Sequence, residues 1–516
     1  MKLLKILALC AFLTACHSAG LSSVPSSLVV AVAQEPQSLN TILLEGPSVA
    51  TIDPLVYSYL LTFDDRGNLV PDLATEVPTL RNGGISSDGL TIVYHLRKGV
   101  VWQDGAPLTA DDVVFTQHAI MNRANNVYDR YGFDKVQAIE APDPLTVRIH
   151  LKAPLSPILT EFFAPANNYG ILPAHVLGRY ANLNHVAFNA LPIGSGPYRV
   201  EKWERGDRVV LKANPSYFRG RPQIPQIVLK FLPDSNTVFG QISTGEVNAN
   251  FFSDPAHLHA FELPGLLITR APFAAFGDLL FNVSSPQMAD PAVRRAFVRA
   301  LDVARIASNA TQGAQTSENP NRALYAQYTD PSIAPPAYDP ARARAVLAPR
   351  HLSLVYIYES GKPVSASVGL QIEQQLRAAG VEVSLKAFSP QMFRALGSAG
   401  GPLFGGKFDV AFFEVFTTGD ADVSWYLGCD AMPPGGFNVT RFCDPAADRA
   451  MKALNQNYDP AVQRRESTIV QRRIAQLVPF VSLWSDNAIY VTPAALHGFA
   501  PSPVSPYWNA WAWSLR

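Results

Sequence analysis

The sequence predicts an α/β protein that is divided into more than one domain. In the second half of the chain, segments with strand composition alternate with amphipathic helical segments, a pattern typical of a mostly parallel sheet covered by helices. The chain has 516 residues, which exceeds the size at which a single hydrophobic core keeps growing. We therefore expect two or three domains.

The N-terminal segment MKLLKILALCAFLTACHSAG predicts an export signal. Lys2 and Lys5 precede an apolar stretch that is too short to span a bilayer. Residues 13–16, Leu-Thr-Ala-Cys, fit the pattern in which Cys16 becomes a lipidated mature N-terminus after removal of residues 1–15. The alternative is an ordinary cleaved signal with an incidental cysteine. In either case we expect an exported protein, and no later apolar segment of the sequence is long enough to span a membrane.

The first strand is predicted at 27–34, where SLVVAVAQ precedes the segment EPQSLN that ends at Asn40. A second strand is predicted at 90–96, followed by a turn at Asp104-Gly105. Thr109 then reads as a helix N-cap with Asp112 in the capping-box position. These features build a scaffold and carry no chemistry.

Residues 194–218 predict two strands joined in a hairpin by Arg205-Gly206-Asp207. A helix is expected over 290–302, with Asp290 as N-cap and Pro291 at the first helical position.

Residues 367–388 predict a helix that ends before Gly380 and a strand that begins at Val381. FDVAFFEVF (408–416) has apolar residues at both parities, as a strand covered on both faces does. This strand leads directly into GDADVSWYLGCD (419–430).

Cysteine usage predicts one disulfide. Cys10 lies in the segment that is removed, and Cys16 is the expected lipid site, so Cys429 and Cys443 remain as a pair in an oxidising compartment. Closing a loop of about 15 residues gives roughly 3 kcal/mol in the loop-entropy model. Metal ligation is the alternative, but the pair lacks the short-spaced partners of a zinc site.

Composition and motifs argue against several classes of function. The 42 basic and 42 acidic side chains give a formal net charge of zero, whereas a nucleic-acid partner requires a basic surface. The sequence contains no G-x-S-x-G, H-E-x-x-H or C-x-x-C motif. We therefore expect no catalytic activity, no metal site and no cofactor.

The acidic corner, which we define as Asp420 and Asp422, is the candidate functional feature. Ligands of open α/β sheets sit beyond the carboxyl ends of parallel strands, and the acidic corner follows such an end. One aspartate can cap a helix through Val423–Tyr426, while the other can face a ligand ammonium or guanidinium beside an apolar wall of Phe416 or Trp425. Glu414, inside the apolar strand, is either a paired structural acid or a second ligand-facing acid.

Several segments together resemble the extracellular solute-binding proteins of family 5, the dipeptide- and oligopeptide-binding lipoproteins of ABC importers. The segments that carry the resemblance are GNLVPDLA (67–74), SSDGLTIVYHLRKGVVWQDGAPLTADDVVF (86–115), GSGPYRVEKWERGDRVVLKANPSYF (194–218), PFAAFGDLLFNVSSPQMADPAVRRAFVRALD (272–302) and NVTRFCDPAADRAM (438–451). The resemblance covers nearly all of the mature chain.

The resemblance implies a two-lobed periplasmic-binding-protein clamshell, type II-like and of cluster C, with an extra inserted domain. The chain would cross between lobes near Pro272 and Pro479, positions suited to a stiff hinge. The implied ranges are 1–15 for the signal peptide, 16–52, 191–270 and 481–516 for lobe I, 53–190 for the inserted domain and 271–480 for lobe II.

By resemblance, a peptide or similar small solute is enclosed between the lobes and delivered to ABC permease subunits with their cytoplasmic ATPases. Relatives bind a peptide ammonium with an aspartate in a segment like GWTGDNGDPDNF; here TTGDADVSW places Gly419 at that position and Asp420 one residue away. The resemblance also implies the Cys429–Cys443 disulfide.

We further expect a lipid-anchored monomer at the outer face of a membrane. Non-peptide ligands of the family, such as nickel or other metal chelates, oligosaccharides, haem or opines, are the alternative to peptides. Tyr356 and Tyr358 fall near a family ligand-contact strand, with a core-facing ring as the alternative for either. Asn40 completes the predicted ligand-binding residues, which are Asp420, Asp422, Phe416, Trp425, Glu414, Tyr356, Tyr358 and Asn40.

Overall fold

The computed structural model describes residues 27–43, 48–127, 129–165, 169–252, 255–311, 313, 328–417 and 422–516. The predicted signal segment, Cys16 and Asp420 lie outside these residues.

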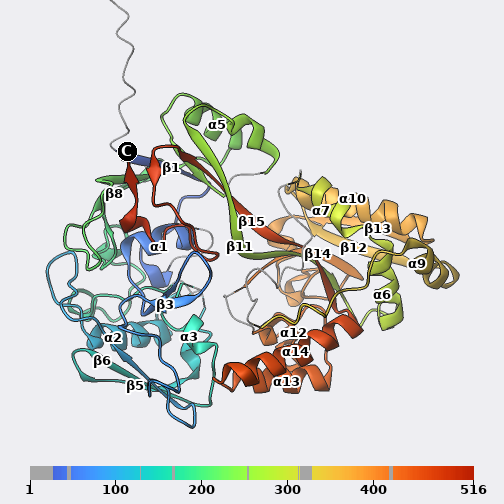
Figure 1. The fold of residues 1–516 in the computed structure, drawn as a ribbon, viewed down its shortest axis with the longest axis horizontal. Coiled ribbons are helices and arrows are strands. Elements are labelled where there is room, and N and C mark those ends of the chain that lie inside the picture. Colours follow the sequence, from blue (N-terminus) through green and yellow to red (C-terminus); the bar gives the residue numbers. More distant parts are fainter. Residues whose placement is uncertain are drawn as a thin grey trace, which may run out of the picture.

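Within the described chain, ten strands form one mixed sheet that runs through the whole molecule (Figure 1). Successive side chains of a strand point to opposite faces of the sheet, so the alternation of apolar and polar residues along most of these strands buries the apolar face of the sheet. In spatial order they are β13 (Glu382–Phe388), β12 (Ser353–Glu359), β14 (Val410–Phe416), β11 (Leu266–Phe281), β15 (Phe480–Pro493), β10 (Ala249–Phe251), β1 (Ser27–Val32), β9 (Gln226–Phe231), β8 (Arg208–Ala213) and β7 (Tyr198–Glu204).

Smaller sheets complete the strands. They are β4 (Thr91–His95), β6 (Thr146–Leu151) and β5 (Val136–Asp143) in one sheet, β2 (Leu61–Phe63) with β3 (Leu69–Pro71), and β16 (Leu496–His497) with β17 (Ser514–Leu515).

The helices of the described chain divide between the two ends of the large sheet. On the N-terminal side they are α1 (Ser48–Val56), α2 (Ala110–Met121), α3 (Ile158–Glu161), α4 (Ala174–Leu177) and α5 (Ser235–Ser243). On the C-terminal side they are α6 (Pro291–Ala300), α7 (Val303–Ala310), α9 (Pro340–Leu347), α10 (Pro363–Ala378), α11 (Pro390–Phe393), α12 (Ser424–Leu427), α13 (Pro445–Asn455) and α14 (Pro460–Leu477).

The local predictions for the scaffold agree with the structure. α2 begins after Thr109, whose N–H donates to the Asp112 carboxylate at 2.9 Å. β7 and β8 form the predicted hairpin. Asp290 caps α6 by accepting the Ala292 N–H at 2.8 Å. Gly380, directly after the α10 C-cap residue, has a φ of 84°, a left-handed conformation that favours glycine.

The hydrophobic cores divide the chain into two bodies. We define the first body by the cluster that contains Leu28, Tyr94, Tyr198 and Trp513, and the second body by two clusters that lie on opposite faces of β14 and β12. Helices α6, α7, α9 and α10 cover one of these faces, and α12, α13 and α14 cover the other (Figure 1). The predicted inserted domain and lobe I share the first cluster, so they pack as one body.

Strands β11 and β15 connect the two bodies (Figure 1). Their pairing shifts register between Pro272 and Phe276, at the predicted first crossing. Trp484 belongs to a core of the second body, whereas Ala488 belongs to the core of the first. Along β15, the change from one core to the other therefore falls between these two residues.

The expectation of a mostly parallel sheet in the second half was wrong on one side of β14. β12 pairs in parallel with β13 and β14, but β11 pairs antiparallel with both β14 and β15. The physical reason is that β11 carries the chain from the first body into the second, whereas β14 and β15 both run back toward the first, and residue alternation does not reveal these directions.

Candidate functional site

β14 carries the chain from a covered sheet to the surface. Val410 to Phe413 are buried, and so is Val415, but Phe416 at the end of the strand is 57% exposed. The Thr417 N–H donates to the Ala274 carbonyl at 2.8 Å, which fixes the exit of β14 beside the crossing segment of β11. Phe416 therefore lies where the second body meets the connection to the first.

Three phenylalanines from distant parts of the chain meet at this place, and we call Phe252, Phe273 and Phe416 the aromatic row. The ring centroids of Phe273 and Phe416 are 6.2 Å apart, and those of Phe252 and Phe273 are 5.2 Å apart, both in edge-to-face orientation. Such geometry is favourable for aromatic pairs. The aromatic row runs from the residue directly after β10 of the first body, across β11, to the end of β14 in the second body.

Phe252 is exposed by 41% although it is a large apolar residue. Its φ is 61°, in the left-handed region that bulky residues seldom adopt. Tyr490 of β15 lies against its ring at 5.7 Å. A strained backbone that holds an exposed ring in place is typical of functional segments, and exposed apolar surface of this kind marks interaction sites.

Asp422, the described residue of the acidic corner, is 7% exposed and bonded within the protein. One carboxylate oxygen accepts the Ser424 N–H at 2.7 Å, so Asp422 bonds the first residue of α12 without being its N-cap residue. The N-cap residue by backbone position is Val423. The other oxygen accepts the Tyr131 hydroxyl of the first body at 3.4 Å.

Glu414 is half-buried and forms an ion pair with Lys362 at 2.5 Å, which agrees with the interpretation as a paired structural acid. Asp486 lies near Glu414, and Asp278 lies near Asp486. Burial raises the pKa of Asp486 to about 7, with the charge of Glu414 as the second cause. Burial also raises the pKa of Asp278 to about 6, against the lowering effect of hydrogen bonds from Ser482 and Tyr426.

Sequence reasoning missed Asp278 and Asp486, although the signal was present. Each interrupts an apolar strand, in FGDLLF and LWSDNAIY, just as Glu414 does. Phe252 and Phe273 were also missed, because nothing in the sequence indicates that these two segments meet Phe416.

The structure argues against two of the predicted ligand-binding residues. Tyr356 has no exposed surface and belongs to a core of the second body. Asn40 is also fully buried; its amide donates to Asn189 at 2.9 Å and its carbonyl accepts the Ile42 N–H at 3.3 Å. Both side chains are used by the fold and cannot reach a solute.

Tyr358 and Trp425 lie at the edges of the cores. Tyr358 packs against Tyr356 with centroids 6.0 Å apart. Trp425 packs against Phe437 at 5.6 Å and is partly buried. Of the predicted wall residues, the structure brings Phe416 and not Trp425 into the aromatic row.

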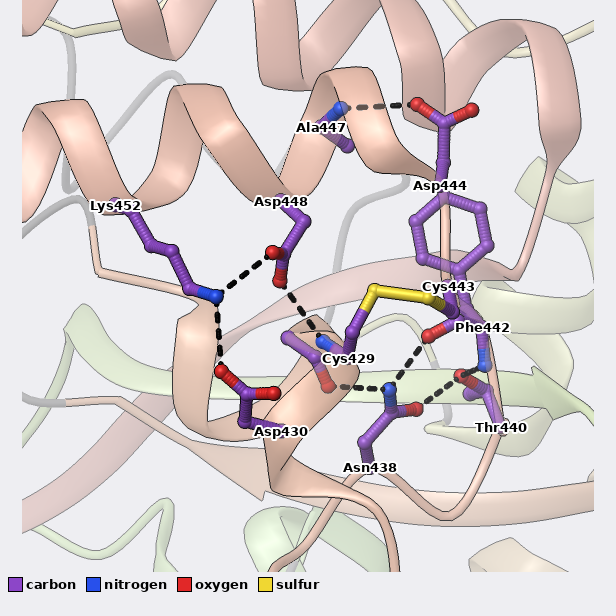
Figure 2. The surroundings of a disulfide bond; sticks show 11 residues. Cys429, Asp430, Asn438, Thr440, Phe442, Cys443, Asp444, Ala447, Asp448 and Lys452 are labelled. Atoms are coloured by element: carbon purple, nitrogen blue, oxygen red, sulfur yellow. Dashed lines mark hydrogen bonds and ion pairs between the residues drawn. A yellow bond between two sulfur atoms is a disulfide. The ribbon is translucent and has the colours of Figure 1, made fainter.

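Cys429 and Cys443 form a disulfide, the pairing that the sequence predicts. Figure 2 shows further contacts beside the disulfide. The Cys429 N–H donates to Asp448 of α13 at 3.0 Å, and Lys452 forms ion pairs with both Asp448 and Asp430. The carbonyl of Phe442, next to Cys443, accepts from the buried Asn438 amide at 2.7 Å (Figure 2). The disulfide thus ties the segment after β14 to α13.

Comparison with known proteins identifies the family. The model of the bacterial extracellular solute-binding proteins, family 5, matches residues 68–432. The chain belongs to this family. It is 26% identical to the oligopeptide-binding protein AppA of Bacillus subtilis, over 100% of this chain and 98% of AppA.

Solved structures of this family share the fold. The structure of AppA from Bacillus subtilis in complex with a nonapeptide matches with a TM-score of 0.75 and 23% identity, covering 95% of this chain and 99% of AppA. The structure of NikZ from Campylobacter jejuni in complex with Ni(L-His) matches with a TM-score of 0.76 and 24% identity, over the same shares of the two chains. These likenesses establish the periplasmic-binding-protein architecture of the family 5 chain.

Within the described residues, none of the helices is both long and apolar enough to cross a membrane. Over the same part of the chain, no three His, Cys, Asp or Glu residues are grouped so that they could hold a metal ion.

Proposed function

We propose that this family 5 protein is the exported solute receptor of an ABC importer, which encloses a peptide or similar small solute between its two bodies and passes it unchanged to permease subunits with their ATPases. The observation that carries this proposal is the aromatic row, because its two exposed rings belong to different bodies. A solute that touches both rings binds better when the bodies are together, so binding favours closure.

The aromatic row supplies an apolar surface that does not depend on the sequence of a peptide. A solute that stacks on Phe252 and Phe416 gains binding free energy, because apolar area of the solute and of the two rings is removed from water. For a peptide ligand, an acid near the end of β14 would hold the α-ammonium, and Asp420 is the candidate for that role. Asp422 is a weaker candidate because its carboxylate already bonds Ser424 and Tyr131.

A non-peptide solute of the same site is the second candidate. The hydrogen bonds that Asp422 makes within the protein favour a non-peptide solute, because Asp420 is then the only one of the two aspartates left to bind the α-ammonium of a peptide. NikZ, a structural relative, is described in complex with Ni(L-His). We propose in either case that the protein is not an enzyme and that it acts as a monomer. We also propose that the lobes and the inserted domain follow the implied ranges, except that the second crossing between the lobes lies beyond residue 480.

Thermal-shift measurements with a ligand panel test the proposal. The panel contains mixed di-, tri- and nonapeptides, Ni(II) with L-histidine, an opine and an oligosaccharide. A specific ligand at a hundred times its Kd stabilises by about 2.7 kcal/mol. We expect at least one peptide pool to raise the melting temperature of the wild-type protein.

Two variants make this result specific to the site. Phe416→Ala should reduce the shift at equal ligand concentration, while Tyr338→Ala, at an exposed position of the second body, should leave it unchanged. A shift that Phe416→Ala leaves intact would contradict the proposed site. A shift with only the chelate, opine or sugar would overturn the peptide assignment and keep the receptor function.

A further inference from the structure

The two bodies also touch at a second place, between the loop after β6 and the turn that joins α13 to α14 (Figure 1). The Ser156 N–H donates to the Asn455 carbonyl at 2.6 Å. The Tyr458 hydroxyl donates to the Leu155 carbonyl at 2.9 Å. The Gln463 amide donates to the Ser156 hydroxyl at 3.0 Å. We call Leu155, Ser156, Asn455, Tyr458 and Gln463 the latch.

The contact is packed as well as hydrogen-bonded. Ser156 is 9% exposed and Asn455 is 7% exposed, so the hydrogen bond between the Ser156 N–H and the Asn455 carbonyl is shielded from water. The Tyr458 ring is seated on the first body: a Cβ added at Gly89 would lie 3.0 Å from it. Burial raises the pKa of Tyr458 to about 12. The Tyr458 ring is thus partly buried against the core of the opposite body.

The latch is joined to the acidic corner through α12. The Asn455 amide donates to the Ser424 hydroxyl at 3.0 Å, and the Ser424 N–H donates to Asp422. Asp422 in turn accepts from Tyr131 of the first body. A continuous set of contacts therefore links the latch to the helix that follows the proposed solute site.

We propose that the latch holds the bodies together, and that Tyr458 sets the balance between open and closed protein without touching the solute. The latch bonds exist only while the bodies meet, so their free energy stabilises the closed arrangement alone. A contact that favours one state shifts the population toward it, and raises the apparent affinity of any solute that needs that state. The inference rests on the opening and closing that the proposed function requires.

Hydrogen exchange of the Ser156 amide tests the latch without any ligand. Its N–H is bonded across the two bodies, so its exchange reports their separation. Tyr458→Phe keeps the ring and deletes the hydroxyl; since one hydrogen bond contributes modestly, we expect exchange to accelerate roughly 2- to 10-fold. Tyr458→Ala should accelerate it further and increase the radius of gyration in small-angle X-ray scattering. Tyr338→Phe, at an exposed tyrosine of the second body, is the matched control and should change neither quantity.

Wild-type exchange at Ser156 in both Tyr458 variants would overturn the proposal. So would an acceleration of equal size in the cores of both bodies, because that pattern reports lost stability and not separation. If Tyr458→Ala does not fold, Tyr458→Phe decides the question alone. Because no solute is used, this outcome is separate from the ligand panel: the latch can fail while solute binding stands, and the reverse.

Discussion

At the residue scale, Asp486 lies in an environment unlike that of an ordinary surface aspartate. One of its oxygens accepts the Trp484 indole N–H at 2.7 Å. Glu414 lies near enough to oppose its ionisation, and Lys362, the cation that lowers its pKa, is already paired with Glu414. The fold therefore holds the carboxylates of Glu414 and Asp486 beside the single ammonium of Lys362, near the place where β11 and β15 pass from one body to the other.

The raised pKa of Asp486 predicts a pH-dependent stability difference. Because the folded pKa of about 7 lies above the unfolded value of about 3.9, ionisation of Asp486 opposes folding as the pH rises between these values. Asp486→Asn keeps an acceptor for Trp484 and cannot ionise. We expect this variant to be more stable than the wild type at pH 8 by about 1–3 kcal/mol, with the difference fading toward pH 4.

Urea unfolding at pH 4, 5, 6, 7 and 8 measures this difference. Asp65→Asn, at an exposed aspartate of the first body, should show no such trend. A stability gain of equal size at every pH would refute the assigned ionisation.

At the element scale, β11 and β15 are long strands that serve both bodies. Each pairs with the other on both sides of the crossing, and the register shifts let the pair bend where the bodies join. Close packing at Gly277 and Trp484 fixes the strands just inside the second body. A Cβ added at Gly277 would lie 2.5 Å from the ring of the buried Trp484.

Gly277→Ala should destabilise the second body, because the added methyl group displaces a buried ring that has no free space. We expect a loss of about 1–3 kcal/mol in the free energy of unfolding. Gly240→Ala is the matched control: this glycine lies in α5 with no atom within 4 Å of the added Cβ. Its helical position should make that variant neutral or up to about 1 kcal/mol more stable. Equal stability of the two variants in urea would contradict the packing argument.

At the scale of the whole molecule, the two bodies are connected on one side by β11 and β15 and meet on the other at the latch. Among the described residues, the buried clusters of the two bodies are separate, so no continuous core joins the bodies there. Motion about the crossing strands can therefore open the latch while each body stays intact.

Membrane attachment is a prediction from the sequence that concerns the whole molecule. We expect Cys16→Ser to release the protein into the soluble fraction, because a single lipidated cysteine is its proposed anchor. Cys10→Ser, in the segment proposed to be removed, should leave the protein with the membrane. Sedimentation of both variants with the membrane fraction would show that Cys16 is not the anchor.

The sequence alone determined the scaffold and the family, because both depend on local patterns. Capping residues at Thr109 and Asp290, the β7–β8 hairpin, the glycine after α10 and the cysteine pair are encoded within short stretches. Phe416 and Asp422 could be singled out as candidates for the same reason: Phe416 ends, and Asp422 follows, a strand whose sequence predicts that both faces are covered.

Only the tertiary structure determined which residues that are distant in the sequence contact one another. It buried Tyr356 and Asn40, paired Glu414 with Lys362, brought Phe252 and Phe273 to Phe416, and seated Tyr458 on the opposite body. These contacts depend on the order and direction of strands in the large sheet. The periodicity of a strand shows which faces are covered but not which strand lies beside it, and the solute site and the latch both depend on that neighbour.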